Sequence, residues 1–302
     1  MFKALSGSRE KAREERMEHE EKQRRRQRNA EIFRDTERCC IENTFLSDAI
    51  AKTAAARLLI PEGAPIPGAL PPMRAKPARV AVSARRSFEA AARYAGTKTC
   101  VLNFASATGP GGGVIRGSSA QEESLCRCST LYPSLISERL WNGFYAPHRA
   151  AGSTLYNDDI IYSPGIVVFK SDDDAPRIMP RENWFTVDVL TCAAPNLRHF
   201  AEDDPERAQR FMHGGELLCI LEKRAERIFE VALRQGAETL ILGAFGCVAF
   251  RNPPDDAAAA FRKAYDAHCR FFDAVEFAVF HTGYETPNFL AFKEAFADVA
   301  EA

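Results

Sequence analysis

The sequence has 302 residues, of which 46% are apolar and 27% charged, as expected for a soluble globular protein of one large or two small domains. Lys and Arg (40) balance Asp and Glu (41), which excludes a uniformly basic nucleic-acid-binding protein but not a local basic patch. No apolar run reaches the roughly 18 residues of a transmembrane helix, and the N-terminus lacks the apolar segment of a secretory signal.

The nine cysteines indicate a reducing compartment. Their number is odd, most lie in apolar runs such as TCVLNF and LLCIL, and no CxxC pair occurs. Cys126 and Cys128 form a CxC pair without a histidine at zinc-finger spacing. We therefore expect reduced, buried thiols, no metal or other cofactor, and a cytoplasmic protein with no membrane association.

The first part of the chain is dense in charge. Acidic and basic residues alternate at helical spacings over residues 9–38, which predicts a solvated helix and a charged helical extension over 1–38. The run RRRQR at 24–28 has two interpretations. In the first, the run contacts a phosphate polymer. In the second, which is favoured, it forms an exposed helix face without such a role.

A catalytic domain is expected over 39–302, beginning with a helix and a proline-rich wrap within 39–77. Residues 45–60 have helical periodicity, and residues 61–77 contain six prolines. From residue 78 onward, apolar strands alternate with helices, which predicts an α/β fold with a mixed central sheet flanked by helices. Strands are expected at 78–83, 98–105, 159–170 (two short strands around a Pro-Gly turn), 183–195, 238–245 and 276–282, and helices at 85–95, from 121, and at 206–234, 255–271 and 287–299.

A glycine-rich loop follows the strand at 98–105, and the next helix begins with Glu122 and Glu123. Glycines allow close approach of a ligand, their amides bind anions, and ligands of α/β sheets lie beyond the carboxyl ends of strands. A ligand with a central pyrophosphate and a terminal ribose would use both the glycines and the carboxylates. The alternative is an ordinary turn followed by a carboxylate that caps the helix dipole.

Three glycines, seven residues and a Gln-Glu-Glu triplet make up the strongest motif: Gly111-Gly112-Gly113 and Gln121-Glu122-Glu123. The motif resembles the GGG-x(6–8)-QEE signature of poly(ADP-ribose) glycohydrolases. Phe-Ala-Ser at 104–106 is similar to the Phe-Ala-Asn that often precedes this loop, with Ser106 in place of Asn. Residues 243–254 resemble the family's second phosphate loop, G-x-[WF]-G-C-G-x-F, with Val248 in place of a glycine.

The resemblance covers roughly residues 40–300 and is closest in type to the bacterial enzymes. It implies a macrodomain-like fold, hydrolysis of ribose–ribose bonds in poly(ADP-ribose) with ADP-ribose as product, and reversal of ADP-ribosylation in the DNA damage response. Glu123 is then the general acid and base, and Glu122 orients the ribose hydroxyls. Neighbouring carboxylates can raise one pKa, which suits an acid at neutral pH.

The resemblance also implies the remaining contacts with ADP-ribose. These substrate-binding residues are Gly111, Gly112, Gly113, Gln121, Ser106, the backbone amides of Gly246, Cys247 and Val248, Phe250 beside a ribose, and Phe280 stacked on adenine. Tyr284 is a rival for the adenine contact, and each aromatic ring has core packing as its alternative. The run Asp172-Asp173-Asp174 is interpreted as a solvated turn.

Two other functions stay open. The first is a non-catalytic reader, which binds ADP-ribose without cleaving it. The second is a hydrolase of mono-ADP-ribosylated protein or nucleic acid. The intact Gln-Glu-Glu triplet favours an enzyme that cuts polymer. We expect cutting mainly from the chain end, with the segment 61–77 and the helix after it as possible covers of the pocket. No obligatory protein partner is implied.

Overall fold

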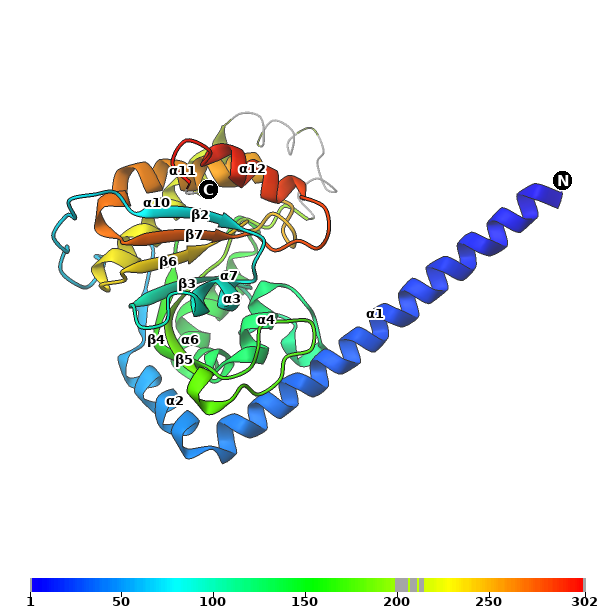
Figure 1. Cartoon of the computed structure of the whole chain (residues 1–302), viewed down its shortest axis with the longest axis horizontal. Helices are drawn as coiled ribbons and strands as arrows, with labels where there is room; N and C mark the ends of the chain where they lie inside the picture. The colour runs from blue at the N-terminus through cyan, green and yellow to red at the C-terminus, as the bar shows by residue number, and fades with distance from the viewer. Residues whose placement is uncertain (1, 199–205, 207–210, 212–214, 301–302) are drawn as a thin grey trace.

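The computed structural model describes residues 2–198, 206, 211 and 215–300, with side chains described from residue 16 onward. A mixed seven-stranded sheet forms the centre, in the order β1-β4-β5-β3-β6-β7-β2 (Figure 1). The strands are β1 (Leu58–Ile60), β2 (Arg79–Ser83), β3 (Thr99–Phe104), β4 (Ile160–Val168), β5 (Phe185–Cys192), β6 (Thr239–Leu242) and β7 (Ala274–Ala278). The run from β5 to β2 is parallel, whereas β1 and β4 pair antiparallel.

Helices cover both faces of the sheet. α10 (Glu216–Arg234), α11 (Pro254–His268) and α12 (Pro287–Ala295) lie on one side of the sheet (Figure 1), with one apolar core beneath them. The other lies under α3 (Ser87–Ala92), α4 (Gln121–Cys128), α5 (Leu131–Leu135), α6 (Glu138–Leu140) and α7 (Ala146–Ala151). The expected mixed sheet between helices is therefore confirmed, and the two buried faces explain why β3 and β6 are apolar along nearly their whole length.

Three parallel strands bring the two glycine-containing loops together. β3, β6 and β7 are neighbours, and their carboxyl ends lie at the same edge of the sheet. The loop that follows β3 contains Gly111–Gly113, and the loop that follows β6 contains Gly246. Segments separated by more than a hundred residues in the chain thus meet at one edge.

Some predicted elements differ from the structure. The helix predicted over 45–60 is α2 (Thr44–Ala56), and Leu58–Ile60 form an edge strand instead because they pair with β4. The two strands predicted over 159–170 are one strand, β4, with a bulge between Ser163 and Ile166. The helix predicted over 206–234 is described from Glu216, and most of its predicted first part lies outside the described residues.

The proline-rich segment 61–77 wraps the side of the molecule opposite to the glycine loops. Its Pro67 and Gly68 carbonyls accept hydrogen bonds from the end of α10, and Arg74 pairs with Asp273, just before β7 begins. These contacts lie at the amino ends of the strands. The expectation that this segment covers the ligand pocket is therefore wrong, because the pocket described below lies at their carboxyl ends.

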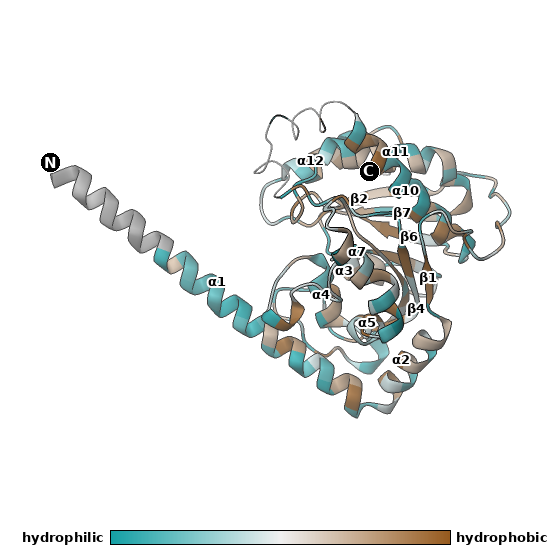
Figure 2. Ribbon diagram, turned by 180° about the vertical axis from the view of Figure 1, so that it is seen from behind, coloured by the Kyte–Doolittle hydropathy of each residue, from teal (hydrophilic) through white to brown (hydrophobic). Residues whose placement is uncertain are grey.

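The N-terminal helix α1 (Phe2–Glu42) is long and projects from the body (Figure 1). In Figure 2 the coloured part of α1 near the body is mostly teal, hydrophilic, whereas the strands of the sheet are largely brown, hydrophobic. Its second half packs against the body through the buried residues Asn29, Phe33, Thr36 and Cys40. A domain boundary at residue 38 stays a prediction. None of the described helices is long and apolar enough to cross a membrane.

Candidate active site

The glycine loop after β3 folds tightly against the glutamates of α4. Gly111 and Gly112 have φ of +65° and +57°, which favours glycine, and a Cβ at Gly112 would lie 2.7 Å from Glu123 Oε1 and 3.1 Å from Glu122 Oε2. A Cβ at Gly111 would lie 2.6 Å from the Tyr132 ring. The absence of side chains therefore lets the loop close over the two carboxyl groups.

Glu123 is buried with one oxygen bound and one oxygen free. Its Oε1 accepts a hydrogen bond of 2.8 Å from the backbone N–H of Gly113. Its Oε2 is buried and has no hydrogen-bond partner among the described residues. A buried polar atom without a partner is costly in a folded protein, so a ligand atom at this position would satisfy it.

Glu122 is buried among hydrogen-bond donors. Its Oε1 accepts from Asn103 Nδ2 at 3.2 Å, and its Oε2 accepts from the Ser106 N–H at 2.8 Å. Burial raises the pKa of Glu122 to about 8, an effect that the nearby Glu123 carboxylate increases and that the hydrogen bonds partly oppose. The expected elevated pKa is therefore found at Glu122, and burial of this carboxyl group is its largest cause.

Gln121 holds the start of α4 against the end of β3. Its Oε1 accepts from the Phe104 N–H at 2.9 Å, and its Nε2 donates to the Leu102 carbonyl and to Ser87 Oγ. Both amide hydrogens are thus used within the protein. Gln121 therefore fixes the start of α4 and so the position of the two glutamates that follow it. A contact between Gln121 and the substrate stays a prediction.

The second loop presents unused backbone N–H groups. Gly246 has φ +74°, and a Cβ there would lie 2.4 Å from Asn252 Nδ2, so the tight turn requires glycine. The N–H groups of Gly246, Val248 and Ala249 have no acceptor within the described part of the chain. The Cys247 N–H, by contrast, already donates to the Ala244 carbonyl. Gly246 and Val248 therefore fit an anion-binding turn better than Cys247 does.

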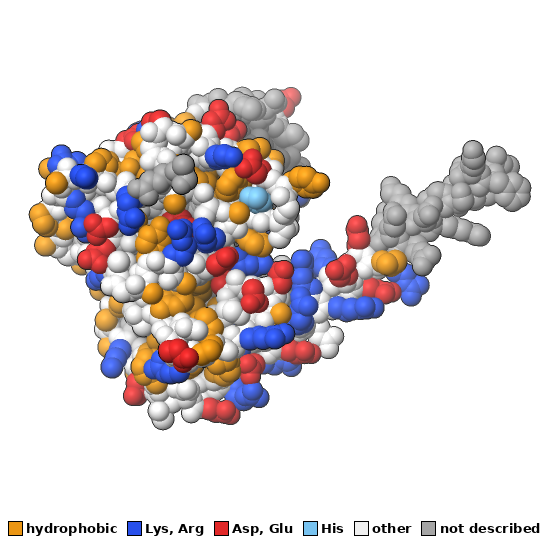
Figure 3. Space-filling view, in the orientation of Figure 1, with side chains coloured by type: hydrophobic (Ala, Val, Ile, Leu, Met, Phe, Trp, Pro, Cys, Tyr) orange, Lys and Arg blue, Asp and Glu red, His pale blue; other side chains and the backbone are white. Residues whose placement is uncertain are grey.

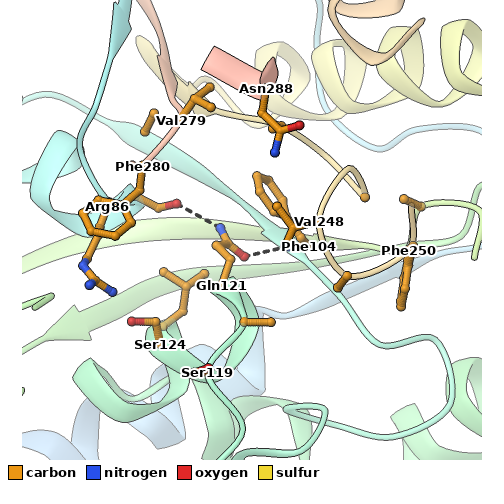
Figure 4. Close-up of a pocket in the computed structure, with 18 of the residues that line it drawn as sticks. Arg86, Phe104, Ser119, Gln121, Ser124, Val248, Phe250, Val279, Phe280 and Asn288 are labelled. Atoms are coloured by element: carbon orange, nitrogen blue, oxygen red, sulfur yellow. Dashed lines mark hydrogen bonds between the residues drawn. The ribbon is translucent and has the colours of Figure 1, made fainter. Parts of the chain in front are cut away.

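A cavity of about 320 Å³ lies between the two loops at the carboxyl ends of β3, β6 and β7. Phe104, Phe250 and Phe280 line it, as Figure 4 shows. Phe280 is 44% exposed, whereas the rival Tyr284 is 91% exposed and does not line the cavity. Glu122 and Glu123 do not themselves line the cavity. They directly follow the lining residue Gln121 along α4 and precede Ser124 and Leu125, which line it again.

Three residues at the site were not predicted. Arg86 stacks on Phe280 with its guanidinium carbon 4.0 Å from the ring centre and pairs with Asp174. Asn103 is a polar residue within the mostly apolar strand TCVLNF, which was a usable sign of its contact with Glu122. Asp172 is held by Ser124 Oγ and the Phe88 N–H, so it belongs to the packed wall of the cavity rather than to a solvated turn.

Comparison with known proteins decides the family. Residues 11–171 match the model of the microbial-type poly(ADP-ribose) glycohydrolase (PARG) catalytic domain. The structure is similar to PARG from Thermomonospora curvata, with 29% identity over 90% of this chain and 100% of that chain and a TM-score of 0.75. PARG from Deinococcus radiodurans in complex with ADP-ribose is 34% identical over 83% of this chain and 98% of that chain, with a TM-score of 0.72. No curated protein sequence matches the chain.

This chain belongs to the microbial-type poly(ADP-ribose) glycohydrolases. The family match spans more than half of the chain, and the solved PARG structures extend the similarity to nearly all of it. The macrodomain-like fold expected from the sequence motif is confirmed by the same comparison. The protein is therefore a glycohydrolase of the PARG family, and its glycine loop and Gln-Glu-Glu triplet are the family motif.

In this PARG family member, the elevated pKa of Glu122 predicts a pH-dependent stability. An unfolded glutamate titrates near 4.5, whereas burial raises the pKa of folded Glu122 to about 8. Between these values the folded protein keeps a proton that the unfolded chain has released. The free energy of unfolding should therefore fall by about 4 kcal/mol from pH 4.5 to pH 8 through this group and level off above pH 8.

Glu122→Gln should remove this contribution and lose most activity, because glutamine cannot titrate and presents different hydrogen-bonding groups. The melting temperatures of wild type and variant are measured from pH 5 to pH 9. We expect the melting temperature of the variant to rise relative to that of the wild type as the pH increases toward 8. Parallel curves would show that Glu122 titrates at its ordinary pKa.

Proposed function

We propose that Glu123 is the general acid and base for hydrolysis of the ribose–ribose bond in poly(ADP-ribose). The observation that carries this assignment is the Oε2 atom of Glu123, which is buried beneath the glycine loop without a partner among the described residues. The Gly113 N–H holds the other oxygen, so the carboxyl group is oriented before substrate binds.

The proposed reaction breaks the bond between C1″ of the terminal unit and the ribose oxygen of the preceding unit. Protonated Glu123 donates its proton to that leaving oxygen as positive charge develops on the terminal ribose. The resulting carboxylate then takes a proton from a water molecule, whose oxygen attacks C1″. The products are ADP-ribose and a polymer shorter by one unit, and Glu123 regains its proton. A protonated Glu122 donates to a ribose hydroxyl and orients it.

We assign the pyrophosphate mainly to the loop after β6. The free N–H groups of Gly246, Val248 and Ala249 point to an anion there, whereas the N–H groups of Gly112 and Gly113 already bind Gly109 and Glu123. Gly111–Gly113 would then contact the ribose and hold the glutamates. Phe280 and Phe250 remain our candidates for the adenine and ribose contacts, and Ser106 supports Glu122 through its backbone.

Known relatives support ADP-ribose as the ligand. The D. radiodurans PARG was crystallised with ADP-ribose, and the T. curvata PARG with the inhibitor ADP-HPD. The latter is 30% identical over 90% of this chain and 100% of that chain, with a TM-score of 0.73. We therefore propose poly(ADP-ribose) or ADP-ribosylated protein as substrate and ADP-ribose as the product that binds the cavity.

We further propose cutting mainly from the chain end. The Phe280 end of the cavity is bounded by Arg86, which is held between the Phe280 ring and Asp174. The start of α3 therefore covers this end, and a chain that continued past the terminal adenosine would have to displace Arg86. A time course with long, end-labelled polymer should show free ADP-ribose as the main early product. Short oligomers that appear before ADP-ribose would indicate internal cutting.

A comparison of substrates separates polymer hydrolysis from the two alternatives, a non-catalytic reader and a hydrolase of mono-ADP-ribosylated substrates. Polymer, mono-ADP-ribosylated protein and mono-ADP-ribosylated nucleic acid are compared side by side with equal amounts of enzyme. We expect turnover of the polymer to exceed turnover of either mono-modified substrate. Binding of ADP-ribose without turnover of any of the three would indicate a reader.

We also propose that the enzyme works in the cytoplasm without an obligatory protein partner. All nine cysteines are free thiols in the structure, and most are buried. Burial raises the pKa of thiols such as Cys40 and Cys247 to about 12, so they are poor nucleophiles and resist oxidation. Fractionation of cells that produce the protein tests this location.

A further inference from the structure

The basic segment 22–28 of α1 has no role in the site described above. It reads Lys-Gln-Arg-Arg-Arg-Gln-Arg, with five positive charges and no carboxylate, and every side chain in it is exposed. Arg24 pairs with Glu20 at 3.7 Å. Within the part of the chain that the structure describes, the other four cations have no carboxylate partner. The segment therefore presents cations that are available to an anionic ligand.

Three of these cations lie on the side of α1 that faces the glycine loop. Side chains spaced by three, four or seven residues share a helix face. Lys22, Arg25 and Arg26 have these spacings to Asn29, which is buried and donates a hydrogen bond to the Gly117 carbonyl. We call Lys22, Arg25 and Arg26 the basic ridge.

The basic ridge is continuous with the catalytic loop. A Cβ on Gly117 would collide with the backbone of Arg26, so helix and loop are in direct contact. Gly117 lies in the same loop as Gly113, four residues later, and the Gly113 N–H donates a hydrogen bond to Glu123. In Figure 3 a hollow separates the body from α1, and blue Lys and Arg side chains gather along α1 where it leaves the body. The ridge thus begins beside the loop that covers Glu123.

We propose that the basic ridge binds the part of the poly(ADP-ribose) chain that lies beyond the scissile bond. This inference rests on the proposed function, which places the terminal unit between Glu123 and Phe280. The rest of the chain then departs from the Glu123 end, beside the glycine loop and α1. Each unit carries an anionic pyrophosphate, which complements the ridge. The stretch 16–28, which is exposed except for the partly buried Glu20, is about 20 Å long, enough to follow the departing chain past the mouth of the site.

The kinetic test compares two triple variants of the full-length protein. The ridge variant is Lys22→Gln, Arg25→Gln and Arg26→Gln. The control variant is Arg16→Gln, Arg24→Gln and Arg34→Gln, which removes equal charge from positions about 140° around α1 from Asn29. We expect the ridge variant to raise KM about tenfold for long polymer and less than about twofold for a two-unit oligomer, with kcat retained. The control should keep the wild-type ratio of the two KM values.

Direct binding gives a second readout. In a Glu123→Gln background, the ridge substitutions should weaken binding of long polymer and lower the salt dependence of its affinity, because fewer counterions are released. If the two triple variants have the same ratio of KM for long polymer to KM for the two-unit oligomer, the proposed role of the basic ridge is wrong. The same conclusion follows if single-stranded DNA competes as well as the polymer, since the ridge would then be a general polyanion site. A wild-type enzyme that fails to cut the two-unit oligomer would instead overturn the proposed function.

Discussion

Replacing Glu123 by glutamine is expected to lower turnover of poly(ADP-ribose) by about a hundredfold or more, while ADP-ribose still binds within several-fold of wild-type affinity. Glutamine keeps the size of the side chain, and its oxygen can still accept the Gly113 N–H. Its amide, however, cannot donate a catalytic proton to the leaving oxygen. The measurements are initial rates on polymer and the Kd of ADP-ribose by calorimetry.

A matched substitution tests whether this effect belongs to Glu123. Glu138→Gln makes the same chemical change on an exposed position of α6 and should leave turnover near that of the wild type. If Glu123→Gln retains more than about a tenth of wild-type turnover, Glu123 is not the acid. If it loses turnover and ADP-ribose binding together, the side chain contributes to binding rather than to proton transfer.

Replacing Gly112 by valine is expected to abolish the rise in melting temperature that ADP-ribose causes, together with most activity. A ligand that binds only the folded protein stabilises it, so the shift reports an intact site. The Cβ would lie 2.7 Å from Glu123 Oε1, and valine strongly disfavours the φ of +57° at this position. The loop would therefore have to open and release both glutamates.

Gly109→Val provides the control within the same loop. An added Cβ at Gly109 has no atom within 4 Å, and its backbone does not require glycine. We expect this variant to keep most of the ADP-ribose-induced shift. A full shift in Gly112→Val would mean that the ligand binds elsewhere or that the loop opens without cost.

The site was predictable from the sequence where its parts are local. The spacing between Gly111–Gly113 and Gln121–Glu123 identified the family, and the strand before the loop placed the motif at the carboxyl edge of a sheet. The partners of these residues were not predictable from spacing. The amides of Gly112 and Gly113 bind other groups of the protein, and the pKa of Glu122 is raised mainly by burial and less by the adjacent Glu123.

The sequence by itself determined the alternation of strands and helices, the family and the pair of glutamates, because these depend on periodicity and on residues close together in the chain. Only the tertiary structure decided what surrounds them. Asn29 meets Gly117 across 88 positions, Arg86 stacks on Phe280, and the segment 61–77 lies at the end of the sheet away from the site. Such contacts follow from strand order and packing, which bring distant segments together. The sequence around each residue does not indicate which distant residue it will contact.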